Sequence, residues 1–224
     1  MVVHHLRNSR SQRILWLLEE LGVAHEVRTY DRDPKTLLAP SELRAVHPLG
    51  KAPVLTDGEV TIAESGAIIE YVVGRYGDGR LVPPAGAPER IRYTYWLHYA
   101  EGSAMPPLVM QLVFNRVRNA PMPFFVRPVA RTIVDRVKRD YLDPQIDRHL
   151  SFMEGELGKS PWFAGDEFTA ADIQMMHPVA SARARAGLSE TTHPHLSDWL
   201  DRVESRPAYK RALQRGGPFK ILEG

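Results

Sequence analysis

The segment HPLGKAPVL at residues 47–55 constrains this chain more than any other part of it. Its Ala52–Pro53 step opens a short apolar run, and an acid-hydroxyl pair, Glu64-Ser65, follows. Cis peptide bonds in proteins are almost confined to X-Pro steps, where they form tight turns. A cis bond here leaves the backbone N–H and C=O of Ala52 facing outward. Those groups can then pair with the backbone of another peptide, as one more strand would.

Glu64 and Ser65 stand where a helical pattern begins. The free N–H groups and the dipole at a helix N-terminus favour a carboxylate. Together with the Ala-Pro turn, this predicts a site for a small peptide with a free carboxylate. Lys51 can reach the far carboxylate of that peptide. The alternatives are a solvated turn lysine at Lys51, a plain helix start at Glu64-Ser65, and an ordinary loop histidine at His47.

Length and charge limit the number of domains and the kinds of partner that this chain can have. The chain has 224 residues, enough for one large domain or two modest ones with a real core. A net charge of +2 gives no reason to expect a nucleic-acid partner. No apolar run approaches the roughly 20 residues that span a bilayer. Residues 1–6 lack the apolar core of a signal peptide. We therefore expect a cytoplasmic protein without a membrane partner.

The chain contains no cysteine. Disulfides, cysteine metal ligands and an enzyme thiol nucleophile are therefore excluded. Any thiol chemistry at the predicted site uses a thiol that the ligand carries.

The N-terminal part alternates strand and helix patterns. Ser9 or Ser11 is expected to cap the first helix, and Gly22 is expected to end it. Its apolar residues at helical spacing are Ile14, Leu17, Leu18 and Leu21. Asp57-Gly58 is a favoured two-residue hairpin turn. The predicted order is β-α-β-α-β-β-α, with strands at 2–6, 26–30, 54–56 and 60–62. The two later helices are expected at about 40–46 and at 65–76.

The sequence after residue 88 has the apolar periodicity of helices. A Gly- and Pro-rich linker at 79–88 separates a predicted domain at 1–78 from a second at 89–224. Pro106-Pro107 should kink or divide the first helical stretch. Thr169 and Asp172 form a capping-box pattern that opens a helix and serves the fold rather than chemistry. The helical patterns cover 89–117, 124–157, 169–186 and 195–215.

Ser9 and Ser11 place a hydroxyl group between the first predicted strand and the first predicted helix. At the positive end of the helix dipole, Ser9 or Ser11 can donate a hydrogen bond to an anion such as a thiolate. A free thiol has a pKa of about 8.5. Lowering this pKa by about two units requires roughly 2.7 kcal/mol of preferential binding to the thiolate. One charge-assisted hydrogen bond of about 1.5–3 kcal/mol, together with the helix N-terminus, supplies this free energy. The alternative is that both serines only cap the helix.

These motifs, taken together, resemble a glutathione transferase of the serine-type fungal and bacterial branch. The resemblance covers nearly the whole chain. It implies a thioredoxin-like N-terminal domain, an all-helical C-terminal domain and a homodimer. The segments that carry it are the Ser-x-Ser-x-Arg helix start at 9–13, HPLGKAPVL at 47–55, AESGAIIEY at 63–71, WFAGDEFTAADI at 162–173 and the closing Pro194, Trp199 and Arg206-Pro207-Ala208.

The resemblance also assigns roles to residues of the site. Ser9 matches the hydroxyl that assists the glutathione thiolate. Asn8 stays open as an alternate because related enzymes place this group four or five positions before the arginine, and Ser11 is a third candidate. Lys51 matches the group near the glycine carboxylate, and His47 lies beside it. Further matches are Ala52 before cis-Pro53 for the cysteinyl backbone, and Glu64 with Ser65 for the γ-glutamyl end.

The expected function is activation of the glutathione thiol for attack on an electrophilic co-substrate, as in detoxification. Glutathione is the co-substrate, and no metal or prosthetic group is implied. Two alternatives remain. One is glutathione-dependent reduction of a disulfide or peroxide at the same site, and the other is a non-catalytic binding module with this fold.

Overall fold

The computed structural model describes residues 1–34, 36 and 38–221. Its first part is a four-stranded sheet of order β2-β1-β3-β4, in which β1 runs parallel to β2 and antiparallel to β3. The predicted order of strands and helices is confirmed. The elements are β1 (Val2–Leu6), α1 (Gln12–Leu21), β2 (Glu26–Tyr30), α2 (Ser41–Val46), β3 (Val54–Asp57), β4 (Val60–Ala63) and α3 (Ser65–Tyr76).

Helix α1 follows the sequence pattern except at its start. Ile14, Leu17 and Leu18 are fully buried, and Gly22 ends the helix in the left-handed region at φ 66°. The expected side-chain cap by Ser11 is wrong: Ser11 has helical dihedrals, and its hydroxyl makes no capping bond. That hydroxyl points back toward β1, to a hydrogen bond with His5.

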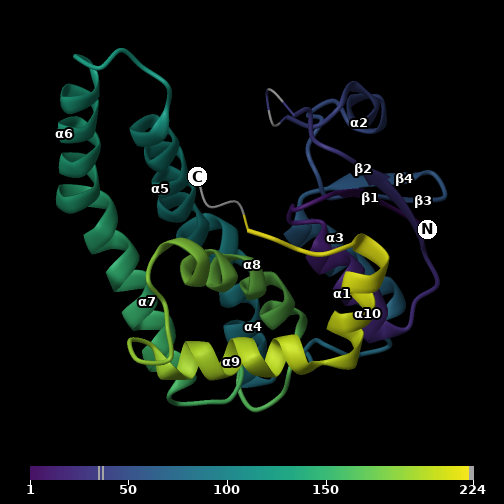
Figure 1. Cartoon of the computed structure of the whole chain (residues 1–224). Helices are drawn as coiled ribbons and strands as arrows, with labels where there is room; N and C mark the ends of the chain where they lie inside the picture. The colour runs from purple at the N-terminus through teal and green to yellow at the C-terminus, as the bar shows by residue number, and fades with distance from the viewer. Residues whose placement is uncertain (35, 37, 222–224) are drawn as a thin grey trace.

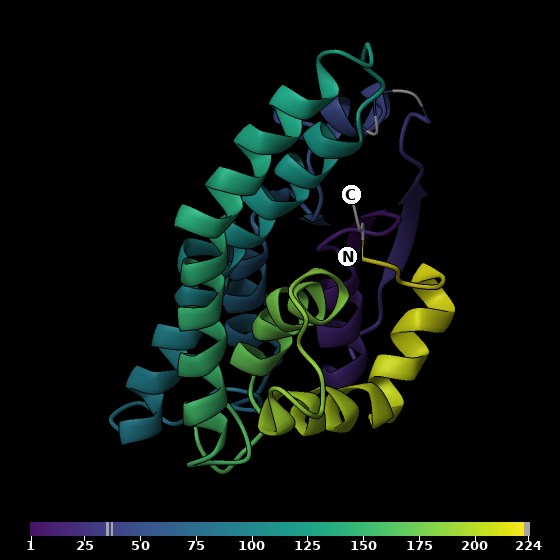
Figure 2. The same ribbon diagram turned by 60° about the vertical axis from the view of Figure 1, so that its left-hand side comes forward.

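The second part is helical, as predicted. Pro106 and Pro107 lie just after a π-helical turn that divides the first helical stretch. Pro207 divides the last helical stretch, because Arg206 before it has extended backbone, as residues before proline prefer. Figure 2 shows α6 and α7 running on through η2 as one long column. The elements are α4 (Pro88–Tyr99), η1 (Ala100–Ala104), α5 (Met105–Asn119), α6 (Arg127–Val137), η2 (Lys138–Leu142), α7 (Asp143–Leu157), α8 (Ala170–Arg185), α9 (Pro194–Ser205) and α10 (Pro207–Gly216).

Helix α8 lies at the centre and is buried along most of its length (Figure 1). Asp172 in its first turn accepts hydrogen bonds from the Thr169 N–H at 3.0 Å and the Trp199 indole at 3.1 Å. It also accepts the Phe163 N–H at 3.0 Å. Both carboxylate oxygens are therefore used to join a loop and two helices, which confirms the structural role predicted for the capping box.

The C-terminal part of the described chain packs against its N-terminal part. Helix α10 packs on α1, where Tyr209 meets the face of Trp16 edge-on. The segment 217–221 then runs back from α10 toward α5 and α8 (Figure 1). In this segment the Lys220 N–H donates to Asn8 Oδ1 at 2.9 Å. The C-terminal segment is thereby tied to the loop between β1 and α1.

A buried ion pair joins the two parts beside that loop. The Arg13 side chain on α1 is 1% exposed and pairs with Glu101 on η1. Its other nitrogen donates to the carbonyl and the side-chain oxygen of Gln174 on α8, at 2.7 and 2.8 Å. Arg10 in the loop donates to the same Glu101 at 3.0 Å. Two arginines near the start of α1 thus converge on one carboxylate of the helical part.

Replacing Glu101 by Gln is expected to destabilise the protein. The change leaves the Arg13 charge buried without its counter-charge, which should cost about 1.5–3 kcal/mol in free energy of unfolding. Urea unfolding measures the loss. The matched control is Glu204→Gln, whose partner Arg183 is 40% exposed, so that change should cost less than about 1 kcal/mol. Equal losses in the two variants would contradict the role given to Glu101.

The same contribution should depend on pH. Burial alone raises the pKa of the Glu101 carboxyl, but Arg13 and Arg10 outweigh burial and bring this pKa below its ordinary value of 4.5. A carboxyl with a depressed folded pKa stabilises the protein above its unfolded pKa, and that stability is lost as the pH falls through the folded pKa. The difference in stability between wild type and Glu101→Gln should therefore hold down to about pH 5 and shrink below it. Urea unfolding across a pH series measures it, and a constant difference would contradict the assignment.

Candidate functional site

Two adjoining cavities lie beside the loop between β1 and α1. The larger has a volume of about 300 Å³ and the smaller about 160 Å³. Arg10, Lys51 and Ala52 line both of them. Because three lining residues are shared, the two cavities adjoin each other.

The smaller cavity is built by the residues that the sequence singled out around the Ala-Pro step. The Ala52–Pro53 bond is cis, as the pattern indicated. Ala52 lies outside the ladder between β1 and β3, which ends at the pair His4–Val54. The predicted residues that line this cavity are His47, Lys51, Ala52, Pro53, Glu64 and Ser65.

Glu64 reaches this cavity through an uncommon backbone conformation. It has φ 69° and ψ 121° at the turn from β4 into α3. Positive φ is unusual for a residue other than Gly, and backbone strain of this kind clusters at functional sites. Ser65 follows as the first residue of α3 and is buried. The cavity therefore holds a carboxylate, a hydroxyl and a helix N-terminus at one end, and Lys51 lies along its wall.

The larger cavity lies between the two parts of the chain. Asn8 and Ser9 come from the sheet side, and Met105, Val109 and Leu112 form an apolar wall from α5. Sequence reasoning did not place these α5 residues, because its helical period does not say which face of α5 turns toward the sheet.

The three candidate hydroxyl and amide groups differ in their placement. Ser9 lines the larger cavity and is almost buried. Ser11 is fully buried behind it, with the two Oγ atoms 2.7 Å apart, and lines neither cavity. Asn8 lines the larger cavity, but its Oδ1 already accepts the Lys220 N–H. The Ser11 N–H donates to Ser9 Oγ at 3.2 Å and holds that oxygen in place.

Positive charge gathers around the larger cavity. Burial lowers the pKa of Arg32, and Arg116 and Arg10 lower it further. Burial, with the charges of Arg13, Arg10 and Arg185, lowers the pKa of His177 on α8, so this imidazole is neutral. Sequence reasoning missed Arg10, Arg32, His177 and Arg185 as site residues. No local pattern marks them, because only the fold brings the β1–α1 loop, the segment after β2 and α8 together.

Neither metal binding nor membrane spanning finds support in the described residues. Among them no group of three or more His, Cys, Asp or Glu side chains could hold a metal ion. In the same part of the chain, every helix is too short or too polar to cross a bilayer.

A thioredoxin-like sheet with a cis-proline loop, joined to a helical bundle, defines a two-part enzyme fold with its site at the junction. The description "Glutathione S-transferase, N-terminal domain" matches residues 1–74, and "Glutathione S-transferase, C-terminal domain" matches residues 107–207. The chain belongs to the glutathione S-transferase family.

Relatives along the whole chain agree with this assignment. Glutathione S-transferase 3 of Schizosaccharomyces pombe is 37% identical over 96% of this chain and 87% of its own length. Glutathione S-transferase 1 of Saccharomyces cerevisiae is 32% identical over 95% and 94%. Among solved structures, a glutathione S-transferase from Actinobacillus pleuropneumoniae superposes with a TM-score of 0.81 at 31% identity, covering 97% of this chain and 93% of that one.

Proposed function

We propose that this protein is a glutathione transferase in which Ser9 assists ionisation of the glutathione thiol for attack on an electrophilic carbon. Named glutathione S-transferases at 37% and 32% identity over most of the chain support the activity. The observation that carries the proposal is the pair of adjoining cavities, one suited to a peptide and the other lined by the Ser9 hydroxyl.

Glutathione has the shape and charge for this site. Its γ-glutamyl end carries an ammonium and a carboxylate, which suit Glu64 and the start of α3 with Ser65. Its glycine carboxylate suits Lys51. Its cysteinyl backbone then lies along Ala52 before cis-Pro53, with His47 at the edge. In that pose the thiol faces the loop that carries Ser9.

The proposed reaction depends on stabilisation of the glutathione thiolate and on holding the electrophile close to it. A charge-assisted hydrogen bond is worth about 1.5–3 kcal/mol, which lowers a thiol pKa by about one to two units. The electrophile would occupy the larger cavity against Met105, Val109 and Leu112. Holding both reactants in one site supplies the rest of the rate enhancement. A prosthetic group is not needed for this reaction, and detoxification in the cytoplasm is the setting that we infer.

Replacing Ser9 by Ala tests the assignment. Turnover with an activated aryl halide should fall by about tenfold or more, the equivalent of one charge-assisted hydrogen bond. Glutathione affinity, measured by calorimetry, should change by less than about threefold, because the peptide is held mainly through other groups. Steady-state kinetics on the same preparations give the turnover.

Matched variants and substrates sharpen this test. Asn8→Ala removes the alternate donor in the same loop and should leave turnover close to wild type. Unchanged turnover in Ser9→Ala, with a loss in Asn8→Ala, would contradict the assignment to Ser9. Turnover of a disulfide or peroxide with none of the aryl halide would instead favour the reductase. No glutathione binding at all would favour a non-catalytic module.

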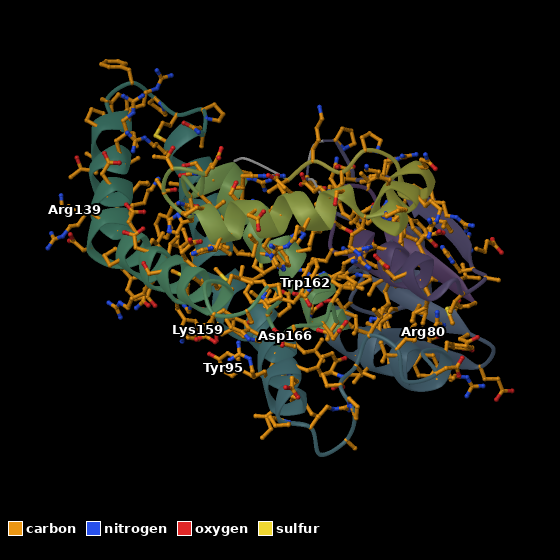
Figure 3. All side chains as sticks on the ribbon, turned by 90° about the horizontal axis from the view of Figure 1, so that it is seen from below. Arg80, Tyr95, Arg139, Lys159, Trp162 and Asp166 are labelled. Carbon is orange, nitrogen blue, oxygen red and sulfur yellow. The ribbon has the colours of Figure 1, made fainter. Side chains whose placement is uncertain are left out.

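We also propose that the protein forms a homodimer. Ile91 and Tyr95, one helical turn apart on α4, are 77% and 48% exposed. Phe152 on α7 is 41% exposed and meets the Tyr95 ring edge-on, with 6.3 Å between ring centroids. Figure 3 shows Tyr95 on the outer side of α4. A contiguous apolar patch of this kind favours contact with another protein surface.

Ile91→Asp should convert the dimer to a monomer, because an isolated charge buried in an apolar contact is costly. Sedimentation velocity measures the change. The control is Ile133→Asp, where the side chain is 56% exposed on α6, a helix that carries none of Ile91, Tyr95 and Phe152, and it should stay dimeric. A monomeric wild type, or a dimer that survives the Ile91 change, would contradict the proposed interface.

A further inference from the structure

A chain of hydrogen bonds leads from the larger cavity into the core behind Ser9. Ser9 Oγ lies 2.7 Å from Ser11 Oγ, and Ser11 Oγ lies 2.8 Å from Nδ1 of His5. Nε2 of His5 lies 3.0 Å from the carbonyl oxygen of Gly216. His5 and Ser11 are buried behind Ser9, and Ser9 alone of the three lines the larger cavity. None of the sequence motifs pointed to His5.

The partners at the inner end fix the direction of the chain. The Gly216 carbonyl can only accept, so Nε2 of His5 carries a hydrogen. Burial lowers the pKa of His5, against the Gly216 carbonyl, which raises it, and with Arg7, which lowers it further. The ring is therefore neutral in the free protein, and its Nδ1 accepts. Ser11 donates its single proton to Nδ1, in preference to the Leu6 carbonyl at 3.3 Å.

This direction determines what Ser9 can offer to a ligand. With the Ser11 proton on the bond to His5, the short contact between the two serines needs the Ser9 proton. The Ser9 hydroxyl hydrogen then points away from the cavity, and its oxygen also receives the Ser11 N–H. In this state Ser9 presents a lone pair to the cavity. It can accept a hydrogen bond from a thiol but cannot donate one to a thiolate.

We propose that the bound thiol passes its proton along this chain to His5, so that the thiolate and the His5 imidazolium form together. The thiol proton moves to Ser9 Oγ, the Ser9 proton moves to Ser11 Oγ, and the Ser11 proton moves to Nδ1 of His5. No proton is gained or lost overall. Every bond in the chain then reverses, and Ser9 donates to the thiolate. The inference rests on the proposed function of the site.

The hydrogen-bond partners of His5 favour the imidazolium, whereas its burial and the charge of Arg7 oppose it. A nucleophile, a base and a third group that orients the base form the arrangement that activates nucleophiles in many enzymes. Here the Gly216 carbonyl orients the imidazole and its bond strengthens when the ring becomes positive. A side chain at Gly216 would meet Gln12 and Leu15 of α1 as well as the His5 ring. Glycine thus allows the α10 backbone to approach His5. A thiol and an imidazole can ionise each other when paired inside a protein.

Proton counting tests the proposal. If His5 keeps the proton, thiolate forms in the wild-type complex with almost no proton released to solvent. The thiolate is measured by its ultraviolet absorbance. Proton release is measured by calorimetry of glutathione binding in buffers of different ionisation enthalpy at neutral pH. S-methylglutathione is the matched ligand, because it carries the same charges without a thiol proton, and its value is subtracted.

Ser11→Ala breaks the chain while the backbone N–H at position 11 still holds Ser9 Oγ. Residue 11 has helical dihedrals and makes no side-chain cap, so Ala fits there. In this variant we expect about one proton released for each thiolate formed. His5→Gln, checked for folding by its thermal transition, should give the same result because it removes the acceptor but not Ser11.

Failure of the proton relay and failure of the proposed transferase function give different results in these measurements. A wild-type complex that releases about one proton for each thiolate, as the Ser11→Ala complex does, would overturn the relay while leaving the transferase intact. A wild type that forms no thiolate on binding glutathione would overturn the relay as well. A wild type that shows no heat of binding with glutathione would contradict the proposed function itself.

Discussion

The convergence of Arg10 and Arg13 on Glu101 joins the sheet to the helical part of the chain. Arg13 is buried in the interface between α1 and the helical part, where a charge persists only with a partner. Its partners come from η1 and α8, so the ion pair sets how the sheet lies against the helical bundle. The site lies along this junction, with Arg10 in the walls of both cavities. A shift at Glu101 would therefore move the apolar wall of α5 relative to Ser9.

The π-helical turn η1 supplies the geometry for that contact. Pro106 and Pro107 follow it after Met105 and lack the N–H groups that a regular helix would need there. A wider turn at this place is typical of helices with a functional irregularity. Glu101 can then face α1 while Met105, on the next turn, faces the larger cavity. One irregularity thus serves both the stability of the junction and the shape of the site.

Local chemistry allowed much of the fold and part of the site to be predicted from the sequence. The apolar spacing of Ile14 and Leu17, the left-handed Gly22 and the cis bond before Pro53 are each fixed by neighbouring residues. Contacts between distant residues could not be read this way. His5 meets Gly216 across a separation of 211 residues, and that pairing, rather than helix capping, accounts for the Ser11 hydroxyl. Arg10 and Glu101 likewise have no shared local pattern.

We propose that an extended tripeptide lies across both cavities with its sulfur at Ser9. A crystal structure of the protein with bound glutathione would show the position of this peptide. We expect the glutathione sulfur within hydrogen-bonding distance of Ser9 Oγ, the γ-glutamyl carboxylate at the start of α3 beside Ser65, and the cysteinyl backbone paired with Ala52. A sulfur that lies nearer Asn8, or a peptide bound in the reverse direction, would contradict it.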